Sequence, residues 1–153
     1  MNFPILSLII FLPLLGSFFV FFSRSKNDIG AIYISILTTF VNLLLCIFLW
    51  WSFDNNFQGF QFVEEKNWIS GYIKFKLGID GISILFIVLT SLIAPICVIS
   101  CINSVKVRLK EFLIAILVLE TFMIGVFCSL DLVIFYLFFE AGLILSLIHI
   151  SEP

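Results

Sequence analysis

Three stretches of this chain run for twenty or more residues without a single Asp, Glu, Lys or Arg: 3–22, 31–51 and 82–103. Two further apolar stretches, 112–128 and 132–150, each contain one Glu. A helix that crosses a bilayer needs about 20 mostly apolar residues, whereas the strands of a membrane β-barrel are about ten residues long and alternate in polarity. All five stretches are apolar on every side. The sequence therefore predicts an all-α, multi-pass transmembrane protein with five helices.

The composition excludes two large functional classes. Hydrophobic residues make up 62% of the chain and charged residues 12%, whereas an ordinary soluble domain has about 45–50% apolar and about 25% charged residues. So few charged residues cannot cover the surface of a small water-soluble domain, which excludes a soluble enzyme. A nucleic-acid-binding protein is excluded as well, because it would need a basic excess, and the chain has 8 Lys and Arg against 10 Asp and Glu. The net charge of −2 by itself says little.

The first apolar stretch is predicted to remain in the mature protein as a transmembrane helix. No basic residue precedes it, as one would in a secretory signal. Bulky residues such as Phe21 and Phe22 stand where a cleavage site would need small ones. We therefore expect this stretch to be the first of the five helices.

Basic residues in two short loops predict the orientation of the helices. The loop at 23–30 holds two of them and the loop at 104–111 holds three. Lys and Arg in short loops favour the cytoplasmic side of the membrane. The order of the predicted helices puts both loops on one side, which we expect to be the cytoplasm, or the matrix in an organelle. The N-terminus, the segment 52–81 and the turn at Asp131 then lie outside.

The segment 52–81 is the only long polar part of the chain. Its residues 73–77 alternate between apolar and basic side chains, a pattern that predicts a short strand. Trp68 and Tyr72 are of the type that lies at the membrane–water interface. Asp80 directly precedes the third apolar stretch, where its carboxylate can cap the helix and interact with the helix dipole. This structural role is the one we predict for Asp80, rather than a catalytic one.

No residue pattern in the chain indicates a cofactor or a metal. The four cysteines lie within or at the ends of predicted helices and lack the companion ligands of a zinc or iron–sulfur site. They are Cys46, Cys97, Cys101 and Cys128. Neither a dinucleotide-binding fingerprint nor a disulfide framework is present. We expect no cofactor and no metal in this chain.

Two acidic residues inside the apolar stretches, Glu120 and Glu140, are the main functional candidates. An ionised side chain at the centre of a bilayer costs about 2.5–3.5 kcal/mol even on insertion scales, and such residues are usually functional. Each Glu is ten residues from Leu130, at the centre of the turn between the fourth and fifth helices. A rise of 1.5 Å per residue puts both carboxyls roughly 15 Å from that turn, at one depth. Whether they face each other depends on helix rotation, which the sequence does not determine.

We predict that Glu140 is a proton-relay residue and that Glu120 is a second candidate for that role. The five stretches contain no Lys or Arg. A cation that would balance these acids must therefore come from helices outside this chain, or the acids must carry a proton. This absence predicts that the chain works within a larger assembly.

Three segments resemble the proton-pumping membrane subunits of the chain M type, mitochondrial subunit 4, in NADH–quinone oxidoreductase, or complex I. Residues 120–144 are similar to the fourth and fifth helices of that family. The segment Leu-Gly-Ile-Asp-Gly-Ile-Ser-Ile-Leu-Phe at 77–86 is similar to the start of its third helix, and Leu-Pro-Leu-Leu-Gly at 12–16 to part of its first. The resemblance covers residues 1–144, so this region looks like the N-terminal part of an antiporter-like subunit.

The resemblance implies specific roles for three acidic residues. Glu140 matches the fifth-helix acid of the family, which pairs with a Lys on a later helix. Glu120 matches a position that is acidic in many members, and Asp131 matches an acidic position at the tip of the helical hairpin. Both glutamates would then contribute to a proton path through the membrane.

The family also implies the surroundings of the chain. NAD, FMN and iron–sulfur clusters would belong to other subunits, and quinone to the complex as a whole. The partners would be other membrane-arm subunits, lipid and protons, with no nucleic acid. The location would be the bacterial inner membrane or the mitochondrial inner membrane. The chain would count as an enzyme only as a subunit of the oxidoreductase and would be inactive alone.

The resemblance ends after Ile144, where the family pattern is replaced by residues 145–153. This last segment, Leu-Ser-Leu-Ile-His-Ile-Ser-Glu-Pro, resembles a translated sequencing adaptor. We predict that it is not native sequence, and we therefore do not expect His149 to be a ligand or a proton carrier.

Two other functions remain open at this point. The first is a subunit of a related cation/proton antiporter, since the motifs are shared in part with that family. The second is a small structural membrane protein without a transport role, for which Glu140→Gln would have no effect.

Overall fold

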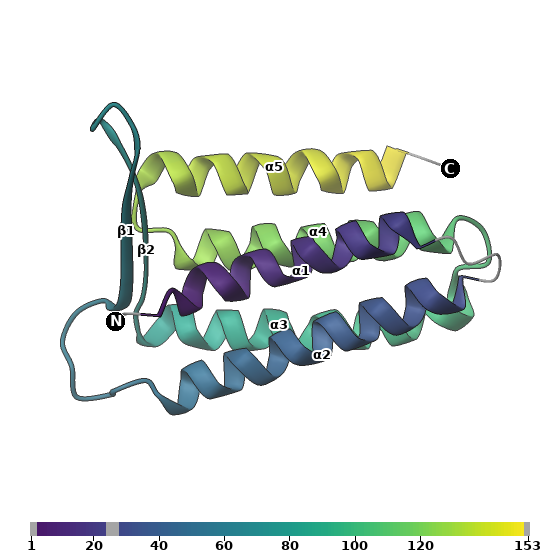
Figure 1. The fold of residues 1–153 in the computed structure, drawn as a ribbon, viewed down its shortest axis with the longest axis horizontal. Helices are drawn as coiled ribbons and strands as arrows, with labels where there is room; N and C mark the ends of the chain where they lie inside the picture. Colours follow the sequence, from purple (N-terminus) through teal and green to yellow (C-terminus); the bar gives the residue numbers. More distant parts are fainter. Residues whose placement is uncertain (1–2, 24–27, 152–153) are drawn as a thin grey trace.

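The computed structural model describes residues 3–23 and 28–151, with side chains up to residue 148. Five helices lie side by side, and a two-stranded β-hairpin crosses one end of the bundle (Figure 1). The helices are α1 (Ile5–Phe22), α2 (Ile29–Trp51), α3 (Gly81–Ser104), α4 (Leu109–Cys128) and α5 (Leu132–Ser151). The strands are β1 (Gln61–Ile69) and β2 (Ile73–Ile79). The predicted helical membrane fold is confirmed, and the hairpin is an addition to it.

Four of the described helices, α1 to α4, are long and apolar enough to cross a membrane. The fifth, α5, has 20 residues, and its described apolar stretch Leu132–Ile148 is shorter. The helix continues past Ile144 without a break, so the structure marks no boundary there. The origin of residues 145–153 stays a prediction.

Helix α4 is the centre of the bundle, because it packs against each of the other four helices and against β2. Small residues allow close packing between helices of the bundle, both at α4 and between α1 and α2. A Cβ added at Gly125 would lie 2.9 Å from the ring of Phe138 on α5. A Cβ at Gly16 of α1 would lie 2.6 Å from Thr38 Oγ1 on α2. Both glycines therefore let neighbouring helices approach.

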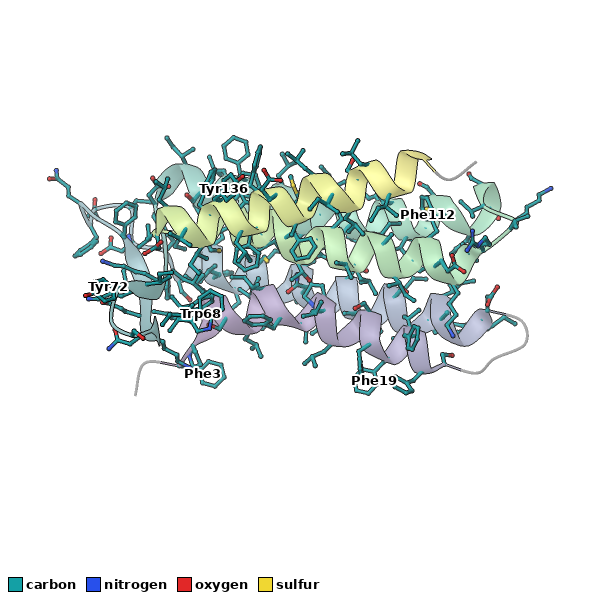
Figure 2. All side chains as sticks on the ribbon, turned by 90° about the horizontal axis from the view of Figure 1, so that it is seen from above. Phe3, Phe19, Trp68, Tyr72, Phe112 and Tyr136 are labelled. Carbon is teal, nitrogen blue, oxygen red and sulfur yellow. The ribbon has the colours of Figure 1, made fainter. Side chains whose placement is uncertain are left out.

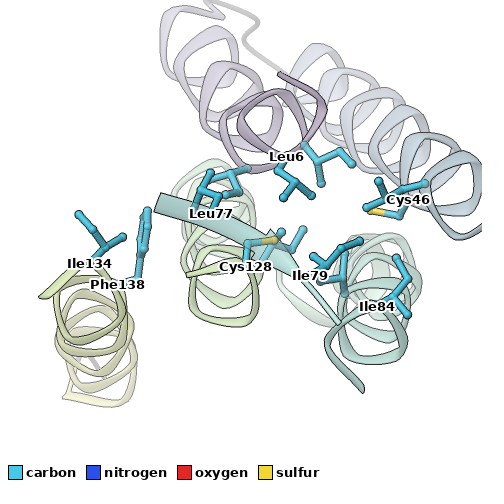
Figure 3. Close-up of a cluster of buried hydrophobic side chains, with 13 residues drawn as sticks. Leu6, Cys46, Leu77, Ile79, Ile84, Cys128, Ile134 and Phe138 are labelled. Atoms are coloured by element: carbon cyan, nitrogen blue, oxygen red, sulfur yellow. The ribbon is translucent and has the colours of Figure 1, made fainter. Parts of the chain in front are cut away.

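The apolar side chains form one buried cluster near each end of the bundle. Figure 3 shows the cluster next to the hairpin, where side chains from all five helices meet β2. Its labelled members are Leu6, Cys46, Leu77, Ile79, Ile84, Cys128, Ile134 and Phe138. A second cluster near the opposite end is built around Val98 and Leu113. The hairpin therefore contributes apolar residues to the membrane bundle as well as covering its end.

The hairpin is attached to the helices by its backbone and by one carboxylate. In β2, the carbonyl of Lys76 accepts from Leu130 N at 3.0 Å, and Leu77 forms a bridge with Ser129. The turn between α4 and α5 thus continues the edge of the hairpin. On β1, the Glu64 carboxylate reaches the first turn of α1. These contacts place the hairpin at the end of the bundle that the sequence predicts to be outside.

Both ends of α1 are capped by side chains that are distant in sequence. The helix has no acidic residue in its first turn, no basic residue in its last turn and no side-chain bond from its N-cap. Glu64 Oε1 accepts from Leu6 N at 2.7 Å, and Ser7 N and Ser7 Oγ also donate to this carboxylate. At the other end, Lys110 Nζ donates to Phe21 O at 2.9 Å and to Ser23 O at 2.7 Å. An anion at a helix N-terminus and a cation at its C-terminus both stabilise the helix.

The end of α1 and the start of α4 lie at one end of the bundle, because Lys110 donates to the carbonyl oxygens of Phe21 and Ser23. Arg24 and Lys26 themselves lie outside the described residues. At the opposite end, Trp68 and Tyr72 project from the hairpin (Figure 2) and are exposed. Aromatic residues of this kind suit a membrane interface.

We expect a cysteine introduced at Lys106 to be inaccessible to a membrane-impermeant thiol reagent in intact cells. Lys106 is exposed at the basic end, which the positive-inside rule puts in the cytoplasm. The matched control is Lys66→Cys in β1, which should be labelled without permeabilisation. The four native cysteines lie within helices and can be replaced by Ser or Ala for this experiment. Labelling of Lys106→Cys in intact cells, with Lys66→Cys protected, would contradict the orientation.

Candidate proton-binding site

Glu120 lies in the interior of the bundle, midway along α4. Its side chain is 3% exposed and accepts a hydrogen bond of 2.8 Å from Nδ2 of Asn42 on α2. Asn42 is completely buried. The contact joins residues 78 positions apart in sequence, and it depends on the packing of α2 against α4.

Asn42 belongs to a polar stripe on the buried face of α2. The members are Ser35, Thr39, Asn42 and Cys46, all of them buried. Their spacing of four, three and four residues keeps them on one face of a helix. Polar residues in membrane helices face the interior of the bundle because lipid offers no hydrogen bonds. The stripe therefore brings Asn42 to Glu120.

The hydroxyl groups near this pair are satisfied within their own helices. Ser35 Oγ donates to Ala31 O at 2.8 Å, and Thr39 Oγ1 donates to Ser35 O at 2.9 Å. Thr121, beside Glu120, donates to Leu117 O at 3.1 Å. Such bonds to the preceding turn are the usual arrangement of Ser and Thr in membrane helices. The Asn42–Glu120 bond is different, because it connects two helices.

Glu140 lies on the outer side of the bundle. Ile134 and Phe138 are buried and mark the face of α5 that packs on α4. Glu140 follows Phe138 by two residues, which is about 200° around the helix. Its Oε1 accepts from Tyr136 Oη at 2.8 Å, one turn earlier on the same helix. Tyr136 is exposed, so this face of α5 is open in the chain.

The structure therefore does not bring the two predicted relay residues together. Glu120 points into the bundle toward α2, and Glu140 lies on the opposite side of the α4–α5 pair. The rotation of the helices, which the sequence leaves open, is decided by the packing of Phe138 against Gly125. The two carboxyls consequently form separate sites.

Asp80 and Asp131 both have the geometry of helix caps. Asp80 Oδ1 accepts from Ser83 N at 2.7 Å at the start of α3, which confirms the predicted cap. This backbone hydrogen bond lowers the pKa of Asp80. The cap therefore stabilises the fold at neutral pH, and its contribution is lost as the pH falls through the lowered pKa. At the start of α5, Asp131 Oδ1 accepts from Val133 N at 2.8 Å; a functional role for Asp131 stays a prediction.

The described part of the chain contains no group of three or more His, Cys, Asp or Glu residues that could hold a metal ion. All four cysteines are free thiols. The side chain of His149 lies outside the described residues. The expectation that this chain carries no cofactor stays a prediction.

Three residues that matter in the structure were not identified from the sequence. Asn42 has a local signal that could have revealed it, since it is the only amide within the apolar stretch 31–51. Glu64 and Lys110 have no such signal. Each contacts α1 across more than fifty residues of sequence, so only the packed bundle identifies them.

Comparison with known proteins points to one group of sequences. The chain is 47% identical over 144 residues to NADH-quinone oxidoreductase subunit M of Rhodobacter capsulatus. It is 46% identical over 143 residues to NADH-ubiquinone oxidoreductase chain 4 of Marchantia polymorpha, and 41% identical over 147 residues to subunit M of Rickettsia conorii. These matches cover 91–92% of the chain and 28–30% of the relatives. The chain thus spans less than a third of the length of the relatives it matches.

Solved structures with the same fold come from two respiratory complexes. A chain of respiratory complex I from Thermus thermophilus with bound NADH matches with a TM-score of 0.76 at 24% identity. The match covers 95% of this chain and 28% of that one. A chain of the membrane-bound sulfane sulfur reductase, an archaeal respiratory membrane complex, matches with a TM-score of 0.77 at 21% identity, covering 100% of this chain and 23% of that one. No protein-family model matches the chain.

Proposed function

We propose that this chain, which is homologous over more than nine-tenths of its length to subunit M (chain 4) of NADH-quinone oxidoreductase, serves in the proton-translocating membrane arm of that enzyme. The observation that carries the proposal is the 47% identity to a curated subunit M over 144 residues, together with a carboxyl group in each of two adjacent membrane helices. The fold alone would not distinguish this function, since a different respiratory complex has a chain of the same fold.

In this proposal Glu140 is the main proton-relay residue. Its carboxyl lies far from both ends of α5, on the face turned away from α4, and its hydrogen-bond partner is Tyr136 on the same helix. An ionisable group in contact with lipid at this depth is costly. We therefore propose that protein from the membrane arm covers this face and supplies the cation that balances Glu140. Glu120 adds a second protonatable group inside the bundle.

The remaining parts of the reaction would take place in other subunits. The described residues hold no metal-binding group, and NADH oxidation requires a flavin and iron–sulfur clusters that this chain has no motif to bind. The chain would act in the bacterial or mitochondrial inner membrane, in contact with lipid and with other membrane-arm subunits. On its own it would be inactive.

The test is co-purification of enzyme activity with the tagged chain from its native membrane. An affinity tag inserted at Gly71 would lie in the turn of the hairpin, next to Tyr72, which is 93% exposed. We expect NADH–quinone reductase activity to co-purify with the tagged protein and to be absent when an unrelated membrane protein carries the tag. A tagged protein that inserts in the membrane and recovers no such activity, while catalysing sodium/proton exchange in vesicles, would indicate an antiporter instead.

A further inference from the structure

The pair formed by Asn42 and Glu120 leaves two buried oxygen atoms without a hydrogen-bond partner. Nδ2 of Asn42 donates to Oε1 of Glu120 at 2.8 Å. Within the described part of the chain, Oδ1 of Asn42 and Oε2 of Glu120 are the buried side-chain polar atoms that lack a partner. Buried polar atoms are almost always paired, so an exception needs a physical explanation.

An ionised Glu120 cannot resolve this deficit. A carboxylate has only acceptor oxygens, so both Oε2 and Oδ1 of Asn42 would remain acceptors with no donor. An unsatisfied buried acceptor destabilises the fold, and a buried charge without a partner destabilises it more. The described Lys and Arg side chains lie on the hairpin or near the start of α4. None of them is in the part of the bundle around Glu120.

A protonated Glu120 supplies the missing donor. Its O–H group can donate to Asn42 Oδ1 while its other oxygen accepts from Asn42 Nδ2. The carboxylic acid and the primary amide are then joined by two hydrogen bonds, and both Oε2 of Glu120 and Oδ1 of Asn42 have a partner. Only the proton is added: one O–H bond forms on the carboxylate and no other bond changes.

We propose that Glu120 and Asn42 form a proton-holding site between α4 and α2, separate from Glu140, in which Asn42 is the positioning residue. Asn42 fixes the orientation of the carboxyl and recognises its protonated form through both edges of the amide. Participation of this site in proton translocation rests on the proposed function. The presence of the proton on Glu120 does not rest on that function, because it follows from the hydrogen-bond geometry alone.

The titratable groups on the surrounding elements do not supply an alternative counter-charge. The described part of α1 has none, and α2 offers buried Cys46 and exposed Tyr33. On α3 the thiols of Cys97 and Cys101 lie near the opposite end of the helix from the hairpin.

The remaining titratable groups lie at the ends or on the outer side of the bundle. Helix α4 itself carries Lys110 and Glu111 in its first turn and Cys128 at its end. Lys74 and Lys76 belong to β2, and Glu140 and Tyr136 to the outer side of α5.

The proposal can be tested by infrared spectroscopy of the full chain in lipid bilayers near neutral pH. A protonated carboxyl group has a C=O stretching band distinct from that of a carboxylate, and the band shifts when H₂O is exchanged for D₂O. Because Glu140 can also carry a proton when the chain is alone in lipid, the comparison is made in the Glu140→Gln chain. We expect the band in Glu140→Gln and its loss when Glu120→Gln is added. Gln can form the same two-edged pair with Asn42, so Glu120→Gln should keep the thermal stability of the chain.

The role of Asn42 has its own readout. Asn42→Leu removes both hydrogen bonds, so the C=O band of Glu120 should move to higher frequency, whereas Asn103→Leu at the exposed end of α3 should leave it in place. If Asn42→Leu fails to fold, the double variant Asn42→Asp/Glu120→Gln tests the pair instead. It exchanges the acid and the amide between the two helices, so that a carboxyl group and an amide group still face each other. We expect that double variant to fold and to show the protonated band.

Three results would overturn the proposal. The first is an equally strong carboxyl band when Glu120→Gln is added to Glu140→Gln, which would show that Glu120 does not hold the proton. The second is an unshifted band in a folded Asn42→Leu variant. The third is a folded Asn42→Asp/Glu120→Gln variant without the band. None of these results depends on whether the tagged chain recovers quinone reductase activity, so this proposal and the proposed function can fail separately.

Discussion

Glu64→Ala is expected to lower the free energy of unfolding by about 2–3 kcal/mol, since hydrogen bonds to a charged group contribute about 1.5–3 kcal/mol. The substitution removes the acceptor for Leu6 N, Ser7 N and Ser7 Oγ in the first turn of α1. The first turn of the helix has no acidic residue of its own, so the Glu64 carboxylate supplies the negative charge that interacts with the helix dipole there. The substitution also removes the side-chain hydrogen bonds that join β1 to α1. Thermal or denaturant unfolding of the chain in detergent micelles measures the effect.

The neighbouring residue provides a matched control for this prediction. Glu65 pairs with Lys74 at 2.8 Å, and both side chains are largely exposed to solvent. An exposed ion pair contributes about 0–1 kcal/mol, so Glu65→Ala should change the stability little. Glu64→Gln should fall between the two, because the amide oxygen still accepts hydrogen bonds but carries no charge. Equal destabilisation by Glu64→Ala and Glu65→Ala would contradict the capping role of Glu64.

The membrane helices could be predicted almost completely from the sequence. The predicted stretches 31–51 and 132–150 correspond to α2 at Ile29–Trp51 and α5 at Leu132–Ser151. A bilayer span of about 20 apolar residues is a simple signal, because every backbone group must be bonded within the helix. Helix ends are less certain, and the apolar stretch that predicted α4 begins at residue 112, one turn after Leu109.

The hairpin could be predicted only in part. Residues 73–77 alternate in polarity and lie in β2, as expected. Strand β1 has no comparable alternation, since Glu64, Glu65 and Lys66 follow one another after two apolar residues. Its strand conformation depends on pairing with β2. The pairing of the two strands also contains register shifts. The pairing of β1 therefore leaves no periodic polarity pattern in its own residues.

The two candidate acids could be identified from the sequence, but the direction of their side chains could not. The turn between α4 and α5 fixes how far each glutamate lies from the end of the bundle. It does not fix the rotation of either helix, and the packed structure assigns Glu120 to the interior and Glu140 to the outer side. Asn42 became relevant only when α2 was found beside α4. The sequence therefore identifies the acids, whereas the tertiary packing identifies their partners.

Glu140→Gln is expected to lower NADH-driven proton translocation by at least roughly tenfold in the enzyme that contains this chain, in line with the contribution of a positioned proton donor or acceptor. Gln keeps the shape of the side chain and its hydrogen bond with Tyr136, but it cannot release a proton. Removing an ionisable group from the membrane does not hinder insertion, so the complex should still assemble. Glu140→Asp should retain partial activity, and Glu120→Gln should have a milder effect.

A control of the same chemical type is available in the preceding helix, α4. Glu111 is exposed at the start of α4, where it pairs with Arg108 at 2.9 Å. Glu111→Gln therefore removes a carboxylate outside the apolar part of the bundle, and it should leave proton translocation unchanged. The comparison separates loss of a relay residue from a general effect of removing a negative charge.

Proton uptake by membrane vesicles during NADH oxidation is the measurement that tests the account most directly. Vesicles with the unmodified chain and with Glu111→Gln should acidify at the same rate when NADH is added. Vesicles with Glu140→Gln should contain the assembled complex in equal amount and take up protons at least roughly tenfold more slowly. Uptake at the unmodified rate by the assembled Glu140→Gln complex would show that Glu140 is a structural residue and that protons do not pass through it.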